Sequence, residues 1–197
     1  LIIRGVTLIN GNGAPPIGPV DVVVKQNVIT QVRVVGYPGV EINENRRPKL
    51  DEGGKEIDAH GMYLLPGFID MHGHIGGTSQ GADPEYVFNL WMAHGITTIR
   101  EPSGRGLDFS LDLKRKSENN SIIAPRIYTY TGFGSGSEIN TPEDAIKWVR
   151  DNAKKGADGI KFFGSSPEIL KAALSENKKL GLRSAFHHAQ MSVARWN

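Results

Sequence analysis

The sequence predicts an α/β fold, a partial (β/α)8 TIM-like barrel of about five units that follows a small β segment. Residues 1–63 contain short runs rich in Val, Ile and Thr, separated by clusters of turn residues. From residue 64 onwards, short apolar runs alternate with amphipathic segments, which is typical of βαβ units and a parallel sheet. A whole barrel takes about 250 residues, so residues 64–197 suffice for about five of its eight units.

The first segment, residues 1–63, is expected to form one small β domain. Strands are predicted for residues 1–9, 20–25 and 28–35, where β-branched residues dominate. Residues 36–54 are polar and rich in Gly, Pro and Asn, which favours a surface loop.

The second segment, residues 64–197, is expected to hold five parallel strands with helices between them. The strands are predicted at residues 64–71, 96–101, 126–131, 159–163 and 183–189. Nearly continuous apolar runs in them indicate strands that are covered on both faces. One helix should begin at Thr141, followed by Pro142 and an acidic first turn, and end at Gly156.

Composition excludes several classes of partner. A net charge of +2, spread along the chain, argues against nucleic acid and anionic membrane surfaces. No apolar run approaches the roughly 20 residues that span a bilayer. Without cysteine, any metal must be held by His, carboxylate or a modified side chain. Localisation stays open: the chain begins at Leu1, so it fits a cytoplasmic protein or a periplasmic or secreted one whose N-terminal signal has been removed.

The strongest chemical signal is the segment LPGFIDMHGH at residues 65–74. Side chains two apart on a strand share a face, so His72 and His74 can present two imidazoles to one metal ion. The pair follows a strand, and barrel active sites lie at the C-terminal ends of strands. Gly73 allows close approach to the backbone, and Asp70 is a candidate support for the histidines.

Residues 66–74 resemble the first barrel strand of the amidohydrolase superfamily, most closely its imidazolonepropionase-like and Xaa-Pro dipeptidase-like branch. Residues 95–101, GITTIRE, resemble the second strand of that branch, although Asp is usual there at the position of Glu101, to which no role is therefore assigned. Residues 56–59, EIDA, resemble the family's N-terminal contribution to a small β-sandwich. The resemblance implies a metal-dependent hydrolase.

Lys161 is a further candidate, because it lies within the apolar run at residues 159–163. Burial disfavours the charged form of a lysine, and two interpretations remain open. The side chain can extend to solvent from a strand end, or it can react with carbon dioxide to give a carbamate. The resemblance favours the second, since the lysine at this position of the branch is commonly carboxylated and bridges two metals.

The fifth predicted strand carries two adjacent histidines, His187 and His188, which must point to opposite faces. The His-Ala pattern of the family matches His188 followed by Ala189, so His188 is chosen as the metal ligand and His187 is expected on the helix-covered face. His60 and His94 are isolated and are expected to be structural or surface residues.

The resemblance implies an enzyme that hydrolyses a C–N bond in an amide, peptide-like or cyclic amide substrate. Two divalent metal ions, of the zinc type, would activate a hydroxide; His72 and His74 would hold one, His188 the other, and Lys161, carboxylated by carbon dioxide, would bridge them. The family's catalytic Asp belongs to an eighth strand and its further His to a sixth, so the catalytic residue is unknown within this chain. A small-molecule or dipeptide-like substrate is implied, and a homo-oligomer is compatible with the sequence.

Two alternatives stay open. One is a mononuclear-metal deaminase of the same superfamily, against which Lys161 argues because such enzymes generally lack a bridging lysine. The other is a non-catalytic fragment or pseudoenzyme, because three barrel strands have no counterpart in the sequence. The chain is expected to be part of a longer protein, since five units would leave sheet edges unpaired.

Overall fold

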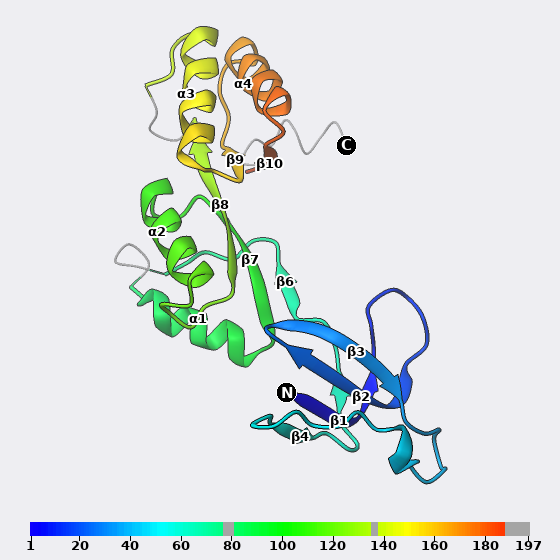
Figure 1. The fold of residues 1–197 in the computed structure, drawn as a ribbon. Helices are drawn as coiled ribbons and strands as arrows, with labels where there is room; N and C mark the ends of the chain where they lie inside the picture. Colours follow the sequence, from blue (N-terminus) through cyan, green and yellow to red (C-terminus); the bar gives the residue numbers. More distant parts are fainter. Residues whose placement is uncertain (77–80, 135–137, 188–197) are drawn as a thin grey trace. The chain divides into compact units, whose positions relative to one another are not determined.

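The computed structural model describes residues 1–76, 81–134 and 138–187 (Figure 1). The chain forms two compact units, residues 1–66 and residues 67–197. None of the described helices combines the length and the apolar composition needed to cross a membrane.

The first unit is built on a five-stranded sheet. Its strands are β1 (Ile2–Leu8), β2 (Ile17–Lys25), β3 (Val28–Val34), β4 (Glu56–Asp58) and β5 (Tyr63–Leu64). β1, β2 and β3 run antiparallel in sequence order, while β4 and β5 both pair with β1 in parallel. The β2–β3 hairpin turns at Gln26 and Asn27, whose φ angles of 49° and 63° suit a tight two-residue turn. The small core of this unit contains Val6, Val20 and Val22.

A buried carboxylate holds the first unit together from within. Asp21 has 0% of its surface exposed. Its oxygens accept hydrogen bonds from Arg4 at 3.0 Å, from Arg47 at 2.9 Å and from the backbone N–H of Gly5 at 2.9 Å. Burial alone would raise the pKa of Asp21, but the two guanidinium groups and the Gly5 N–H outweigh it and lower that pKa below its usual value.

The second unit is built on a parallel sheet that confirms the predicted half-barrel pattern. Its strands are β6 (Phe68–Asp70), β7 (Ile96–Pro102), β8 (Arg126–Phe133), β9 (Gly159–Phe162) and β10 (Arg183–Phe186). They lie side by side in sequence order, each parallel to the next, and form a curled sheet (Figure 1). The helices between them are α1 (Pro84–Ala93), α2 (Leu107–Glu118), α3 (Pro142–Lys155) and α4 (Pro167–Lys179).

The helices pack on one face of this sheet. Phe133, Ile160 and Phe162 from the strands pack against Val149 of α3 and Ala173 of α4. A second cluster joins strand residues to α1 and α2 and contains Ile75, Phe88, Ile99, Leu113 and Ile127. The opposite, inner face of the sheet therefore consists of the alternate strand residues.

Local capping explains the helix positions. The Thr141 hydroxyl accepts a hydrogen bond from the Asp144 backbone N–H, and the Asp144 carboxylate accepts one from the Thr141 backbone N–H, so a capping box begins α3 at the predicted residue. Gly156 ends α3 with a φ of 106°, a conformation that suits glycine.

One predicted strand is wrong in its extent. Residues 64–71 were expected to form a single strand, but Leu64 belongs to β5, and β6 covers only Phe68–Asp70. Pro66 lacks a backbone N–H and interrupts the ladder, so the two pieces join different sheets. His72 and His74 consequently lie in the loop after β6 rather than within a strand.

Candidate metal centre

The loop after β6 brings His72 and His74 together. Their ring centroids lie 5.2 Å apart in an edge-on arrangement. The backbone N–H of Gly73, between them, donates a hydrogen bond to the Arg100 carbonyl at 3.1 Å, which ties the loop to β7. A Cβ at position 73 would lie 3.0 Å from the ring of Trp91 on α1, so glycine lets the loop lie closely against that helix.

Two carboxylates hold this loop from either side. Asp70 accepts a hydrogen bond from the backbone N–H of His72 at 2.8 Å, which fixes the backbone of the loop, and its role as a support for the histidine rings stays a prediction. Glu101 is 0% exposed and accepts from the backbone N–H of Ile75 at 2.5 Å, while its Oε1 lies 3.3 Å from Nδ1 of His74. Burial raises the pKa of Glu101, and the Ile75 N–H opposes that shift.

Glu101 is the functional candidate that sequence reasoning left without a role. The available signal was a carboxylate near the C-terminal end of a predicted barrel strand, where barrel sites gather their polar side chains. Its partners follow only from the packing of the loop after β6 against the end of β7.

Lys161 belongs to strand β9, and only 3% of its surface is exposed. Its Nζ donates a hydrogen bond to the carbonyl of Phe186 at 3.2 Å. Burial lowers the pKa of Lys161, and the positive charge of Arg100 lowers it further. The pKa of His72 is also lowered, first by burial and then by the charge of Lys161, so the lysine and this histidine influence one another electrostatically.

The structure describes one of the two histidines after β10. The register pairs Ala185 with Lys161, and the ladder continues through a hydrogen bond from the His187 N–H to the Phe162 carbonyl at 2.9 Å. The His187 ring lies 5.3 Å from that of Phe163, a ring that Lys161 Nζ approaches to 6.0 Å. His187 thus lies on the side of Lys161, and the expectation that it faces the helices is wrong because β10 pairs with β9 in this register. His188 lies outside the described residues, so its assignment as a ligand stays a prediction.

The other isolated histidines have local partners. His94 caps the end of α1, where its Nδ1 lies 2.7 Å from the Leu90 carbonyl. His60 is paired with Asp58 in the first unit. Both are local structural contacts of exposed residues.

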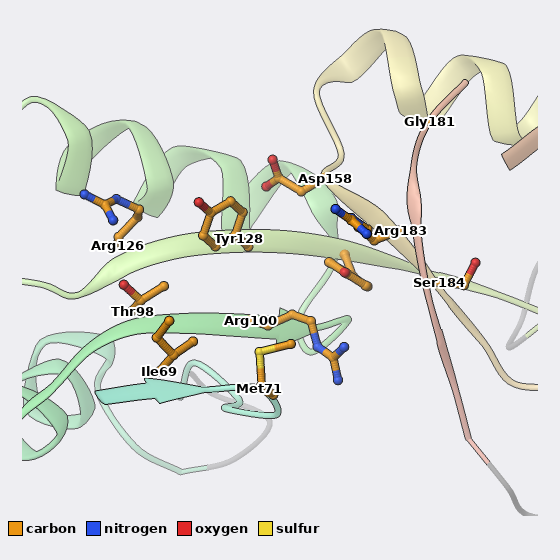
Figure 2. Close-up of a pocket in the computed structure, with 11 residues that line it drawn as sticks. Ile69, Met71, Thr98, Arg100, Arg126, Tyr128, Asp158, Gly181, Arg183 and Ser184 are labelled. Carbon is orange, nitrogen blue, oxygen red and sulfur yellow. The ribbon is translucent and has the colours of Figure 1, made fainter. Parts of the chain in front are cut away.

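A pocket of about 650 Å³ lies against the strands of the sheet, and its lining includes Met71, the residue before His72. Figure 2 labels most of its lining, in which Thr98 and Arg100 come from β7, Arg126 and Tyr128 from β8, and Arg183 from β10. Arg126 and Arg183 begin their strands, and the lining combines three arginines and Asp158 with apolar and aromatic side chains. Barrel chemistry takes place at the opposite, C-terminal ends, so the pocket is not assigned as the reaction site.

The donor set fits a metal ion in part. Two imidazoles lie together, the charge of the buried Lys161 is felt at His72, and a lysine carbamate would add the anionic oxygens that divalent ions bind. Within the described ranges, no group of three or more His, Cys, Asp or Glu residues is suited to hold a metal. The cluster therefore fits part of a metal centre, and further ligands must come from Lys161 in modified form or from residues outside those ranges.

Fold and site together define a parallel β/α half-barrel whose candidate chemistry lies at the C-terminal ends of the strands. No family model matches the chain. Among curated proteins, it is 36% identical over 98 residues to adenine deaminase 2 of Desulfotalea psychrophila, covering 45% of this chain and 17% of that protein. It is 26% identical over 153 residues to adenine deaminase of Bacillus velezensis, covering 72% of this chain and 26% of that protein.

Solved structures share the fold. A Xaa-Pro dipeptidase with bound methionine superposes with a TM-score of 0.66 at 22% identity, covering 94% of this chain and 56% of the other. Molinate hydrolase superposes with a TM-score of 0.73 at 16% identity, covering 99% and 55%. The sequence matches to adenine deaminases and the shared fold agree with the predicted resemblance to the amidohydrolase superfamily. The chain spans about a quarter or less of the curated relatives and about half of these solved structures.

Proposed function

We propose that this chain supplies part of the active centre of a metal-dependent hydrolase that cleaves a C–N bond in an amide, peptide-like or cyclic amide substrate. The observation that carries the proposal is the pairing of His72 and His74 in the loop after β6, on the same parallel sheet that carries the buried Lys161 on β9. A desolvated lysine is costly, and core packing alone does not require it.

His72 and His74 would hold one divalent ion of the zinc type. Lys161, once carboxylated, would bind both this ion and a second divalent ion. When bound, such ions lower the pKa of water towards neutrality and polarise the oxygen of the scissile carbonyl. Asp70 and Glu101 would keep the two histidines in place through the hydrogen bonds that they already make.

The environment of Lys161 favours its carboxylation. Burial and Arg100 lower the pKa of the lysine, which increases the neutral amine that reacts with carbon dioxide. The amine nitrogen forms a bond to the carbon of carbon dioxide and releases one proton, and the product is an anionic carbamate. A buried cation is thereby replaced by an anion that Arg100 attracts instead of repels.

Deamination of an aminopurine is the second candidate. It is favoured by the sequence comparison, because the curated proteins reported above are adenine deaminases. That reaction also replaces a C–N bond with a C–O bond by hydrolysis, and releases ammonia. Lys161 favours the first candidate, since a bridging lysine belongs to the two-metal centres that the resemblance implies.

The test uses the complete gene product, purified with zinc. Bound metal is measured by elemental analysis, and turnover is measured with Xaa-Pro dipeptides, from which proline release is followed, and with adenine, from which ammonia release is followed. We expect bound zinc and dipeptide hydrolysis, both lost in His72→Ala and His74→Ala and both retained in the matched control His94→Ala. Release of ammonia from adenine, without hydrolysis of the dipeptides, would establish the second candidate function, deamination of an aminopurine. Wild-type protein without bound metal or either activity would instead support the non-catalytic alternative.

A further inference from the structure

Glu101 is a buried carboxylate whose partners differ from those of an ordinary buried ion pair. It is 0% exposed, yet among the described residues it forms an ion pair with His74 and with no lysine or arginine. Its Oε2 accepts the backbone N–H of Ile75 at 2.5 Å, the backbone N–H of Gly104 also donates to the carboxylate, and Oε1 lies 3.3 Å from His74 Nδ1.

We infer that Glu101 is a positioning residue, which accepts a hydrogen bond from Nδ1–H of His74 and so leaves the Nε2 lone pair of that ring free for a metal ion. The inference rests on the proposed function and deepens it, because it states how one ligand is prepared before metal arrives. It assigns a role to a residue that lies 27 positions from its histidine in sequence.

The direction of the hydrogen bond follows from the other donors. Backbone N–H groups can only donate, so the oxygens of Glu101 that face Ile75 and Gly104 act as acceptors. Oε2 takes the Ile75 N–H and Oε1 faces the ring; when the carboxylate is ionised, Oε1 can only accept, so the proton shared with His74 belongs to the imidazole nitrogen. A neutral imidazole with Nδ1 protonated has its lone pair on Nε2, which is the form that binds metal.

The surroundings support a dedicated role for this carboxylate. The backbone after β7 turns back over it, with Ser103 at a φ of 72°, a positive value that non-glycine residues rarely adopt. A Cβ on Gly104 would come within 2.9 Å of Oε1, so the turn lies directly on the carboxylate. The His74 side chain is still 40% exposed, so its remaining ring nitrogen is accessible from the mouth of the sheet.

The test uses the complete gene product with ¹⁵N-labelled histidine, first without metal and then with zinc. Nitrogen chemical shifts of His74, assigned by comparison with His74→Asn, report its tautomer, and competition with a chelator reports zinc affinity. We expect wild-type His74 to carry its proton on Nδ1. Glu101→Gln should lose that preference and bind zinc about 10- to 100-fold more weakly.

Asp158→Asn is the matched control. Asp158 is also a network carboxylate, bound to Lys114 Nζ at 2.8 Å and the Thr129 N–H at 2.7 Å, but it lies at the other end of the strands. It should leave the His74 tautomer and zinc affinity unchanged. Protonation of His74 on Nε2 in the metal-free wild type, or unchanged affinity in Glu101→Gln, would overturn the inference. If Glu101→Gln does not fold, the wild-type tautomer alone decides. A wild-type protein that binds no zinc would refute the proposed function. The tautomer of His74 in the metal-free protein would still show whether Glu101 positions that ring.

Discussion

Asp21 and Glu101 are both completely buried carboxylates, but their surroundings push their pKa values in opposite directions. Asp21 is held by two guanidinium groups and one backbone N–H, and its pKa falls. Glu101 has backbone N–H groups and one histidine, and burial raises its pKa. A buried carboxylate that is paired with guanidinium groups stabilises the fold. A buried carboxylate whose partners are backbone N–H groups and a histidine can instead orient that histidine as a metal ligand.

The largest effect on stability is expected for Asp21→Asn. The change removes the buried anion that Arg4 and Arg47 share and leaves them only their exposed partners Glu56 and Glu44, and breaking such a buried pair costs about 3–5 kcal/mol of unfolding free energy. Urea denaturation of the complete gene product measures it. Asp58→Asn is the control, because Asp58 is 81% exposed, and it should change little. Equal losses in the two variants would contradict the structural role of Asp21.

The pH dependence of Asp21 has a defined sign. Its pKa is lower in the folded than in the unfolded chain, so its contribution is present above the unfolded value of about 4 and is lost as pH falls through the folded value. The stability difference between wild type and Asp21→Asn should therefore shrink below about pH 4. Denaturation curves at pH 7 and pH 3 test this, and a difference that grows towards acid would exclude the explanation.

Lys161→Met should separate stability from metal binding. Methionine is similar in length and apolar, so it relieves the desolvation that lowers the pKa of the lysine, and unfolding free energy should stay equal or rise. Because the folded pKa of Lys161 is depressed, the wild type should gain stability as pH rises towards about 10.5, and the variant should lose that gain. Zinc content should fall by about one ion if the lysine bridges two metals. Full zinc content in a folded Lys161→Met protein would refute the bridge.

His187 and His188 are adjacent in sequence, and the next prediction concerns which of the two binds zinc. The family pattern favours His188, but the pairing of β10 with β9 places His187 on the side of Lys161. From this geometry we expect His187→Ala to weaken zinc binding more than His188→Ala does, because alternation permits only one of them to face the site. Zinc titrations of both variants decide it, and the reverse order would restore the choice made from sequence.

Local patterns in the sequence were sufficient for much of the fold. Thr141 and Gly156 define the ends of α3 through capping chemistry within a few residues, and apolar runs predict the parallel strands. Long-range pairing was not predictable in the same way. Leu64 joins β1 in the first unit, and no neighbour of Leu64 in sequence encodes that partner.

The site shows the same limit. His72 and His74 are identified by their spacing, and Lys161 by its apolar surroundings. The contact between Glu101 and His74 depends on how the loop after β6 packs against the end of β7, and the side that His187 faces depends on the register of β10. Both are tertiary properties that spacing along the chain does not contain.

The central claim is that His72, His74 and Lys161 share one metal centre, and anomalous diffraction from zinc-loaded crystals of the complete gene product tests it most directly. We expect a zinc peak at about 2.0–2.1 Å from one ring nitrogen of His72 and of His74, with electron density for a carbamate beyond Nζ of Lys161. Histidine rings that diverge in well-ordered density, or a zinc peak far from all three side chains, would contradict it.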